Sequence, residues 1–248
     1  MVEITVAERM VAAMSHHLKD GEVVIMGAFS ALPMLASRLA QLTHAPNVSF
    51  ICGGSGAVNP TLEPLPESSC DDRLLRAECI YALPDVIDLE ARPEIDVFFA
   101  GGLQIDAKGN CNLVGIGKPG EIKFRGPGSV GLPFLSRAGR YIIYTMAHNV
   151  RNFVPEVDFI SGPGFVDNEL LSDGPSLVIT PLCVMDFEDK KMRLKSTHPG
   201  VTVEMVKENT GFEIIVPEDV GETPAPTDEE LEIMKRLDPS GAARDSIR

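Results

Sequence analysis

The sequence predicts an α/β protein built on an open, mostly parallel sheet that is flanked by helices. Two short apolar runs, residues 22–26 and 48–52, have the length and composition of buried strands. Each run ends in small residues or glycines, which is typical of a tight turn. Residues 32–42, between the two runs, have helical period. Two strand–turn–helix units in the first quarter of the chain favour parallel strands joined by helical crossovers.

Capping residues predict where several helices begin. Thr5-Val6-Ala7-Glu8 is a capping box, and Thr227-Asp228-Glu229-Glu230 is a second one near the C-terminus. Thr202 caps a further helix, which Gly211 stops. The other predicted elements are, in order, a helix at 84–91, strands at 95–100, 140–146, 157–160 and 177–180, a hairpin joining 184–187 to 192–195, and a strand at 212–216.

The composition is that of a soluble globular protein. The chain has 248 residues, of which 44% are apolar and 23% charged, as in ordinary globular domains. No internal repeat and no compositional shift marks a domain boundary. We therefore expect a single domain over residues 1–248, with a polar C-terminal extension from about residue 217.

Charge and hydropathy exclude several classes of partner. The chain carries 36 acidic and 22 basic residues, a net charge of −14, which disfavours nucleic acid and anionic membrane surfaces as partners. No apolar run approaches the roughly 20 residues of a membrane span, and residues 1–10 lack a signal-peptide pattern. We expect a cytoplasmic protein that binds neither nucleic acid nor membranes.

The cysteines do not form a metal or redox motif. There are five of them, at scattered positions, and no C-x-x-C pair occurs. Reduced thiols in the cytoplasm are the expected state. No metal site is predicted.

The glycine-rich turn after the second predicted strand is the main candidate for an active-site wall. It contains Gly53, Gly54, Ser55 and Gly56. Glycines allow positive φ and close approach of a ligand to the backbone, and ligands of open α/β sheets sit at the carboxyl ends of strands. The segment is one residue away from G-x-S-x-G, but that motif needs a helix straight after the serine, and Pro60 makes one difficult.

Three further features of the sequence each allow two interpretations. Gln104, Asn110 and Asn112 offer amide donors and acceptors close together, either for a ligand or for loop backbone. His148 is either a base or a structural histidine. The proline-rich loop 59–70 is either a lid or subunit contact or a plain surface connection; its two glutamates, Glu63 and Glu67, are either acid/base groups or solvated carboxylates.

Residues 126–131 match G-x-G-x-x-G, but the surroundings argue against a dinucleotide site. Pro127 removes an N–H that would face phosphates. Pro133 interrupts the start of a long helix, and no acidic residue follows about 20 positions later. A loop that admits another phosphorylated or acyl ligand is favoured.

Several segments, taken together and in order, resemble the β subunit of class I coenzyme A transferases of the glutaconate type. They are 101–106 (GGLQID), 108–112 (KGNCN), the 126–131 loop, 148–159 (HNVRNFVPEVDF), 196–202 (STHPGVT), 208–212 (ENTGF) and 237–241 (LDPSG). The resemblance implies a coenzyme A transferase-like fold and an α subunit of similar fold, in an α2β2 assembly. It also implies a coenzyme A thioester as substrate, with no permanently bound cofactor.

The resemblance also shows where this chain departs from the family. Family transferases use a β-subunit glutamate, in a Glu-Ser-Gly pattern, to attack the thioester. Here the pattern is Gly54-Ser55-Gly56, so no certain catalytic residue is expected in this chain. One family branch with this loss is the two-subunit ring-opening hydrolases of actinobacterial steroid (cholesterol) degradation, in which an α-subunit glutamate acts as base.

By resemblance, we expect the β subunit of such a hydrolase, which cleaves a C–C bond of a cyclic diketone-like coenzyme A ester. Two alternatives stay open: a coenzyme A transferase β subunit and a non-catalytic scaffold subunit. The residues expected to bind the substrate are Gly53, Gly54, Ser55, Gly56, Gln104, Asn110, Asn112, Gly126, Gly128, Ser129 and Gly131.

Overall fold

The computed structural model describes residues 4–166, 172–241 and 243. The chain divides into two compact units. The first comprises Met1–Phe99 and Pro224–Arg248, and the second comprises Ala100–Thr223. Among the described residues, no helix is both long enough and apolar enough to cross a membrane. The prediction of a single domain over the whole chain stays a prediction.

The first unit is built on five strands in the order β5-β1-β2-β3-β4. The parallel centre of this sheet is β1 (Val23–Met26), which pairs with β2 (Ser49–Cys52) and β5 (Val97–Ala100). The short strands β3 (Ala57–Val58) and β4 (Cys79–Ile80) extend it in antiparallel fashion. The apolar side chains of the three parallel strands are almost all buried, as expected for strands covered on both faces.

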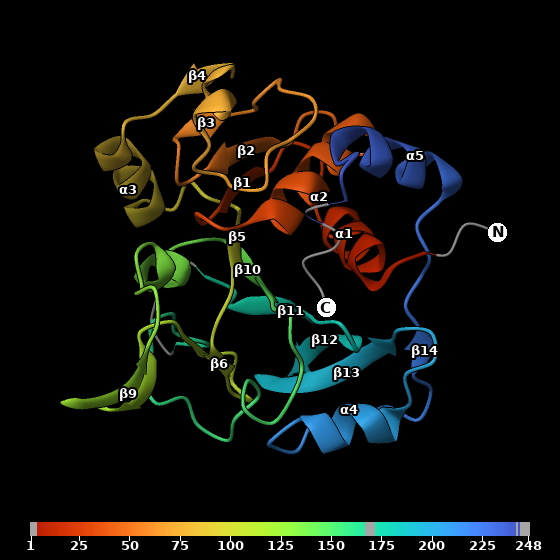
Figure 1. Ribbon diagram of the computed structural model, residues 1–248. Helices are drawn as coiled ribbons and strands as arrows, with labels where there is room; N and C mark the ends of the chain where they lie inside the picture. Colours follow the sequence, from red (N-terminus) through yellow and green to blue (C-terminus); the bar gives the residue numbers. More distant parts are fainter. Residues whose placement is uncertain (1–3, 167–171, 242, 244–248) are drawn as a thin grey trace. The chain divides into compact units, whose positions relative to one another are not determined.

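Helices cover this sheet, as Figure 1 shows. Helix α2 (Ala31–Leu42) packs on β1 and β2, and α1 (Val6–His16) and α5 (Asp228–Leu237) pack on α2. A further helix, α3 (Leu83–Ala91), leads into β5. Both predicted capping boxes are confirmed at the starts of α1 and α5. The polar C-terminal extension therefore contributes a packed helix to the first unit.

Within the described residues, the main strands of the second unit are five, in the order β14-β13-β12-β11-β10. They are β10 (Arg140–Tyr144), β11 (Pro175–Ile179), β12 (Cys183–Glu188), β13 (Lys191–Thr197) and β14 (Gly221–Glu222). The pairs β10–β11 and β13–β14 are parallel, and β12 is antiparallel to both of its neighbours. Helix α4 (Val203–Asn209) follows β13, with Thr202 as its N-cap as predicted.

Smaller elements complete both units. Two antiparallel pairs stand apart from the main strands of the second unit: β6 (Gln104–Ile105) with β7 (Cys111–Asn112), and β8 (Gly115–Lys118) with β9 (Glu121–Arg125). Two 3-10 helices are η1 (Asp72–Leu75) in the first unit and η2 (Leu132–Ser136) in the second.

The predicted α/β class is confirmed, and two predicted strands are not. Residues 157–160 form no strand, because the Asp158 N–H bonds to the side chain of Gln104 (3.0 Å) instead of to a neighbouring strand. Of residues 212–216, only Ile215 makes a β-bridge, to Arg193. The glycine-rich β8–β9 pair has no long apolar run, and the sequence did not predict it.

Candidate functional site

The glycine turn lies at the carboxyl end of β2, as predicted. Its shape is set by backbone hydrogen bonds: Gly53 N–H donates to Met26 O (2.9 Å), and the N–H groups of Ser55 and Gly56 both donate to Cys52 O (3.1 and 2.8 Å). The chain then enters β3, not a helix. The hydroxyl of Ser55 lies 3.5 Å from Cys52 O. The strand–turn–helix setting of a serine nucleophile is therefore absent here.

Two glycines of this turn are required by the backbone. A Cβ on Gly53 would lie 2.6 Å from Met26 O, and a Cβ on Gly56 would lie 1.9 Å from Tyr81 O. Gly56 also has φ +73°, a conformation in which a side chain is strained. These two positions exclude side chains for steric reasons alone.

Gly54 is different, because what opposes a side chain there is another side chain. Its φ lies outside the left-handed region, and a Cβ built on it would lie 2.2 Å from Cys70 Sγ. The Cα and Cβ atoms of Cys70 would both lie 3.3 Å away. The Cys70 thiol therefore occupies the space where the side chain of residue 54 would begin. Nothing in the sequence around Cys70, which lies in the proline-rich loop, indicated this contact.

Serine hydrogen bonds hold Cys70 in this place. Ser69 is fully buried, and its hydroxyl lies 2.6 Å from Gly27 O and 2.9 Å from Ala28 O. The Ser69 N–H donates to Ala28 O (3.1 Å), and the Ser68 hydroxyl donates to the same oxygen (3.1 Å). The end of the loop is thus fixed to the turn that follows β1, which sets the position of the thiol.

The rest of the 59–70 loop is attached to the C-terminal helix. Leu65 N–H donates to Leu237 O (2.8 Å), and the Glu63 carboxylate lies 3.3 Å from Arg236 Nε and 3.8 Å from an Arg38 nitrogen. A cavity of about 190 Å³ lies beside the loop; it is lined by Ala31, Leu35, Pro64, Leu65, Pro66, Glu67, Arg73, Asp238, Pro239, Ser240 and Ala243. Glu63 is an ion-paired carboxylate, and Glu67 faces the cavity. A lid role for this loop stays a prediction.

In the second unit, two of the predicted amides form one buried network. Asn112 is fully buried; its Nδ2 donates to Gln104 Oε1 (2.7 Å) and Gly115 O (2.8 Å), and its Oδ1 accepts from Val114 N–H (3.0 Å). Gln104 Nε2 donates in turn to Asp158 Oδ2 (3.2 Å). Both amides hold loop backbone, one of the two alternatives for them. Direct contact with a substrate stays a prediction.

Asn110 belongs to a separate turn. Its Nδ2 donates to Asp106 Oδ2 (2.9 Å), and its Oδ1 accepts from Gly164 N–H (2.7 Å). Asp106 Oδ1 also accepts from the N–H groups of Lys108 (3.0 Å) and Asn110 (3.1 Å). Asn110 therefore closes the tight turn that the sequence predicted for this segment.

The 126–131 loop lies beside the Gln104–Asn112 network. Gly126 N–H donates to Val114 O (2.9 Å), and Gly128 N–H donates to Leu113 O (3.0 Å). A Cβ on Gly126 would lie 2.2 Å from Leu113 O, so only glycine fits. The loop ends at Gly131 (φ +82°) and is followed by the short 3-10 helix η2. The described residues that follow form no long helix, so the loop is not placed at the N-terminus of one.

His148 has the contacts of a structural histidine. It is buried and stacks on Phe153 with ring centroids 4.1 Å apart. Its Nδ1 lies 2.8 Å from Thr180 Oγ1, and its Nε2 lies 3.0 Å from Thr210 Oγ1. The Thr210 hydroxyl donates to Val206 O (2.7 Å), so the ring donates from Nε2 to Thr210. Burial lowers its pKa to about 4.

The thiols fall into two groups. Cys52, Cys111 and Cys183 are buried, and burial raises the pKa of each to about 12. Cys70 and Cys79 are exposed. In the part of the chain that the structure describes, no three His, Cys, Asp or Glu side chains gather as metal ligands.

Known proteins of one family match nearly the whole chain. The coenzyme A transferase family matches residues 7–209. The chain is 35% identical to the B subunit of the 3-oxoadipate CoA-transferase of Pseudomonas knackmussii, over 95% of this chain and 94% of that protein. It is 30% identical to the B subunit of the glutaconate CoA-transferase of Acidaminococcus fermentans, over 95% and 93%.

Two relatives carry names other than transferase. The chain is 28% identical to the cholesterol ring-cleaving hydrolase IpdB subunit of Rhodococcus jostii, over 96% of this chain and 94% of that protein. The crystal structure of the decarboxylase AibA/AibB superposes with a TM-score of 0.87 at 29% identity and covers 99% of both chains. The chain belongs to the coenzyme A transferase family, as a subunit of the B type.

Proposed function

We propose that this chain is the B subunit of a two-subunit enzyme that cleaves a carbon–carbon bond of a cyclic ketone linked to coenzyme A. The observation that carries the proposal is the Gly54–Cys70 contact. The family's covalent chemistry begins with a carboxylate at this turn, and here a glycine stands at the position, with a thiol in the adjacent space. A hydrolytic reaction needs no acyl intermediate on this residue.

The proposed reaction uses water and a base. The base, supplied by the partner subunit, removes a proton from water, and the hydroxide oxygen bonds to the ring carbonyl carbon. The ring C–C bond then breaks, and its electron pair moves to the carbon next to the second carbonyl as an enolate. Protonation of that carbon gives a ring-opened carboxylic acid. Coenzyme A enters and leaves as part of the substrate, with no resident cofactor.

In this proposal, this chain provides a wall of the pocket and the space beside it, and the catalytic base comes from the partner subunit. The backbone at Gly53 and Gly56 leaves no room for side chains, and the thiol of Cys70 is smaller than a glutamate side chain would be. A bulky ring gains space at this wall. The relatives named as subunits of two-chain enzymes support an assembly with an A-type partner, which we propose to be α2β2.

The experiment combines the chain with its A-type partner and a cyclic diketone coenzyme A ester in ¹⁸O-labelled water. The expected result is a ring-opened acid that carries one ¹⁸O atom, with no hydroxylamine- or borohydride-sensitive adduct on this chain. A trapped glutamyl thioester on either subunit, with coenzyme A exchange, would favour the second candidate, a transferase. The 35% identity to a 3-oxoadipate CoA-transferase chain supports that alternative.

A substitution separates both candidates from a scaffold role. Gly54→Leu fills the proposed pocket wall and should lower turnover by the assembled complex at least about 100-fold, since misplacement of about 1 Å already costs this much. Gly221→Leu is the matched control, because a Cβ there meets nothing within 4 Å. Full turnover by an intact Gly54→Leu complex would indicate a scaffold subunit.

A further inference from the structure

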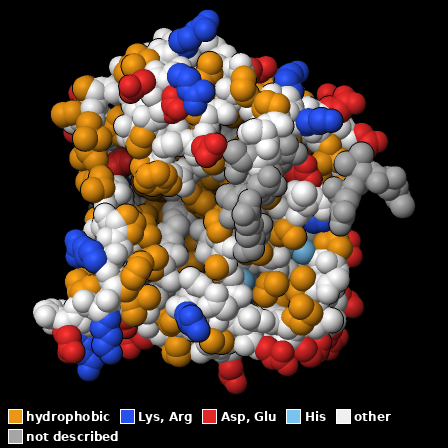
Figure 2. Space-filling view, in the orientation of Figure 1, with side chains coloured by type: hydrophobic (Ala, Val, Ile, Leu, Met, Phe, Trp, Pro, Cys, Tyr) orange, Lys and Arg blue, Asp and Glu red, His pale blue; other side chains and the backbone are white. Residues whose placement is uncertain are grey.

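Helix α3 is packed through few side chains. Of its nine described residues only Val86 and Glu90, one turn apart on the same face, are buried. Its N-cap, Ala82, makes no side-chain capping bond. Apolar residues at its start are exposed, Leu83 by 60% and Ile80 of β4 by 52%, and Figure 2 shows hydrophobic side chains at the left edge, where α3 lies in Figure 1. Because so short a helix is marginal on its own, its packing depends on the two buried side chains.

One of these two side chains, Glu90, is a carboxyl group without a partner. It is 6% exposed, and its Oε2 is buried with no hydrogen-bond partner among the described residues. An ionised carboxylate in such a place loses hydration that no hydrogen bond replaces. Burial therefore raises the pKa of the Glu90 carboxyl from its ordinary 4.5 to about 7. The packed carboxyl carries a proton at mildly acidic pH and loses it to water near neutrality.

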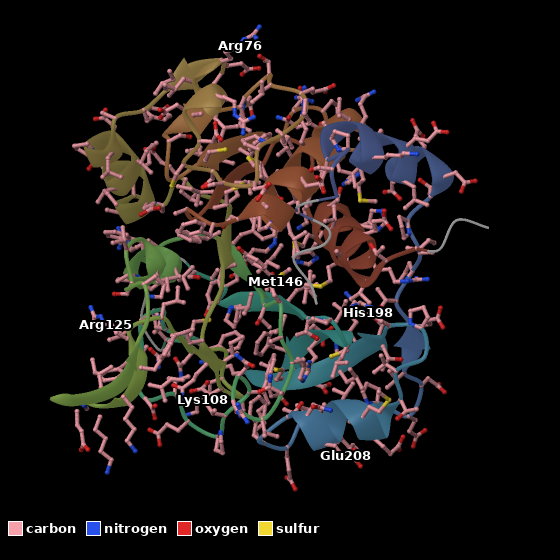
Figure 3. All side chains as sticks on the ribbon, viewed as in Figure 1. Arg76, Lys108, Arg125, Met146, His198 and Glu208 are labelled. Atoms are coloured by element: carbon pink, nitrogen blue, oxygen red, sulfur yellow. The ribbon has the colours of Figure 1, made fainter. Side chains whose placement is uncertain are left out.

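The charged side chains next to Glu90 in the sequence have other partners. Arg92 pairs with Asp88 and lies 3.9 Å from a Glu94 carboxylate oxygen. Figure 3 shows Arg76, which precedes β4, pointing outward from the first unit and away from α3. Burial is the one cause of the raised pKa of Glu90, so none of these charges offsets it.

The sheet offers no counter-charge either. None of the strands β1 to β5 in the described first unit carries a charged side chain. The connections β1-α2-β2 and β4-α3-β5 run in opposite directions across this sheet. Since such crossovers are right-handed, α2 and α3 cover opposite faces. The charged residues of α2, and of α1 and α5 that pack on it, therefore lie across the sheet from α3.

The start of α3 is bonded to the glycine turn. Tyr81 N–H donates to Gly56 O (2.9 Å), and β4, directly before Tyr81, pairs with β3, directly after the turn. The Tyr81 carbonyl fills the space beside Gly56, where a Cβ would lie 1.9 Å from its oxygen. The next residue, Ala82, accepts the first helical bonds, from the N–H groups of Asp85 and Val86. Packing of α3 thus fixes one side of the turn.

We propose that α3 is a pH-sensitive support for the glycine turn. The helix packs while Glu90 carries a proton, and it loosens when that proton passes to water, because the carboxylate is then drawn toward solvent. Loosening of α3 frees Tyr81 and, through its hydrogen bond, the backbone at Gly56. This property goes beyond the proposed reaction, since it holds whichever chemistry takes place at the turn.

The test is amide hydrogen exchange of the full chain, followed by mass spectrometry, with each rate divided by the intrinsic rate at that pH. Because the pKa of Glu90 is higher when the helix is packed, packing is favoured at acidic pH and weakens up to about pH 7. The interval from 4.5 to about 7 allows an increase in opening of about 300-fold at most. We expect peptides covering 79–92 to open at least about 10-fold more at pH 8 than at pH 5, and peptides of α2 to serve as reference.

Two variants make the test specific. Glu90→Gln keeps the size of the side chain but does not titrate, so opening of 79–92 should no longer depend on pH. Asp85→Asn is the matched control, because Asp85 is an exposed carboxylate on the same helix; this variant should keep the full pH dependence.

PH-independent opening of the wild-type helix would by itself overturn the inference. Equal pH dependence in Glu90→Gln, or its loss in Asp85→Asn, would also overturn it. If α3 opens with pH while the amide of Tyr81 stays protected, the coupling to the turn is wrong. Exchange is measured without substrate, so failure of the proposed reaction leaves this result unaffected.

Discussion

Replacing Gly54 by alanine tests the contact on which the proposed function depends. The new methyl carbon would lie 2.2 Å from Cys70 Sγ, far inside van der Waals contact, so the thiol or its loop must move. Overpacking of this kind costs about 1–3 kcal/mol. Cys70→Ala removes the sulfur and leaves Cys70 Cβ at 3.3 Å, a tight but tolerable distance. The double variant should therefore recover most of the lost stability.

The assay is urea unfolding of the wild type, the two single variants and the double variant. Cys70→Ala alone should cost less than about 0.5 kcal/mol, because its side chain is exposed. The expected coupling energy between the two positions is about 1–2 kcal/mol. Gly56→Ala serves as control: its clash is with Tyr81 O and its φ is +73°, so Cys70→Ala should not rescue it.

Additive effects of Gly54→Ala and Cys70→Ala would refute the reasoning. In that case the thiol would not occupy the space beside Gly54, and the main support for a reaction without a covalent carboxylate would be lost. If Cys70→Ala rescued Gly56→Ala to the same extent, that would also contradict the reasoning, because Cys70→Ala would then stabilise the chain regardless of a contact with residue 54.

Three further outcomes are expected. Gly54→Glu combined with Cys70→Ala should admit a carboxylate at the turn and yield a hydroxylamine-sensitive adduct that the wild type lacks. Iodoacetamide at pH 8 should label Cys70 and Cys79 in the native chain and spare the three buried cysteines; substrate should protect Cys70. The pKa of His148 is lowered to about 4 in the folded chain, so the unfolded chain binds more protons between about pH 6.5 and 4; stability should fall by at most about 3 kcal/mol as the pH drops through this range, and His148→Gln should flatten the fall.

Local patterns were sufficient for much of the fold. A capping box is complete within four residues, so Thr5 and Thr227 marked the starts of α1 and α5 without tertiary information. The buried strands β1 and β2 were visible as apolar runs, since a strand covered on both faces needs apolar side chains throughout. Residues 157–160 had the same appearance, but the Gln104 side chain takes the Asp158 N–H that a neighbouring strand would need.

For the candidate site too, some features follow from the sequence and others only from the tertiary structure. The sequence alone determined that glycine stands at position 54, and that the family's carboxylate is therefore missing. Only the tertiary structure placed the Cys70 thiol beside it and gave Asn112 and Asp158 a role in holding strand β8 at Gly115 and Gly117. The physical reason is the separation along the sequence of the residues that interact. Caps and strand patterns are set by neighbours in the sequence, whereas a contact between distant loops exists only after the strands and helices have packed.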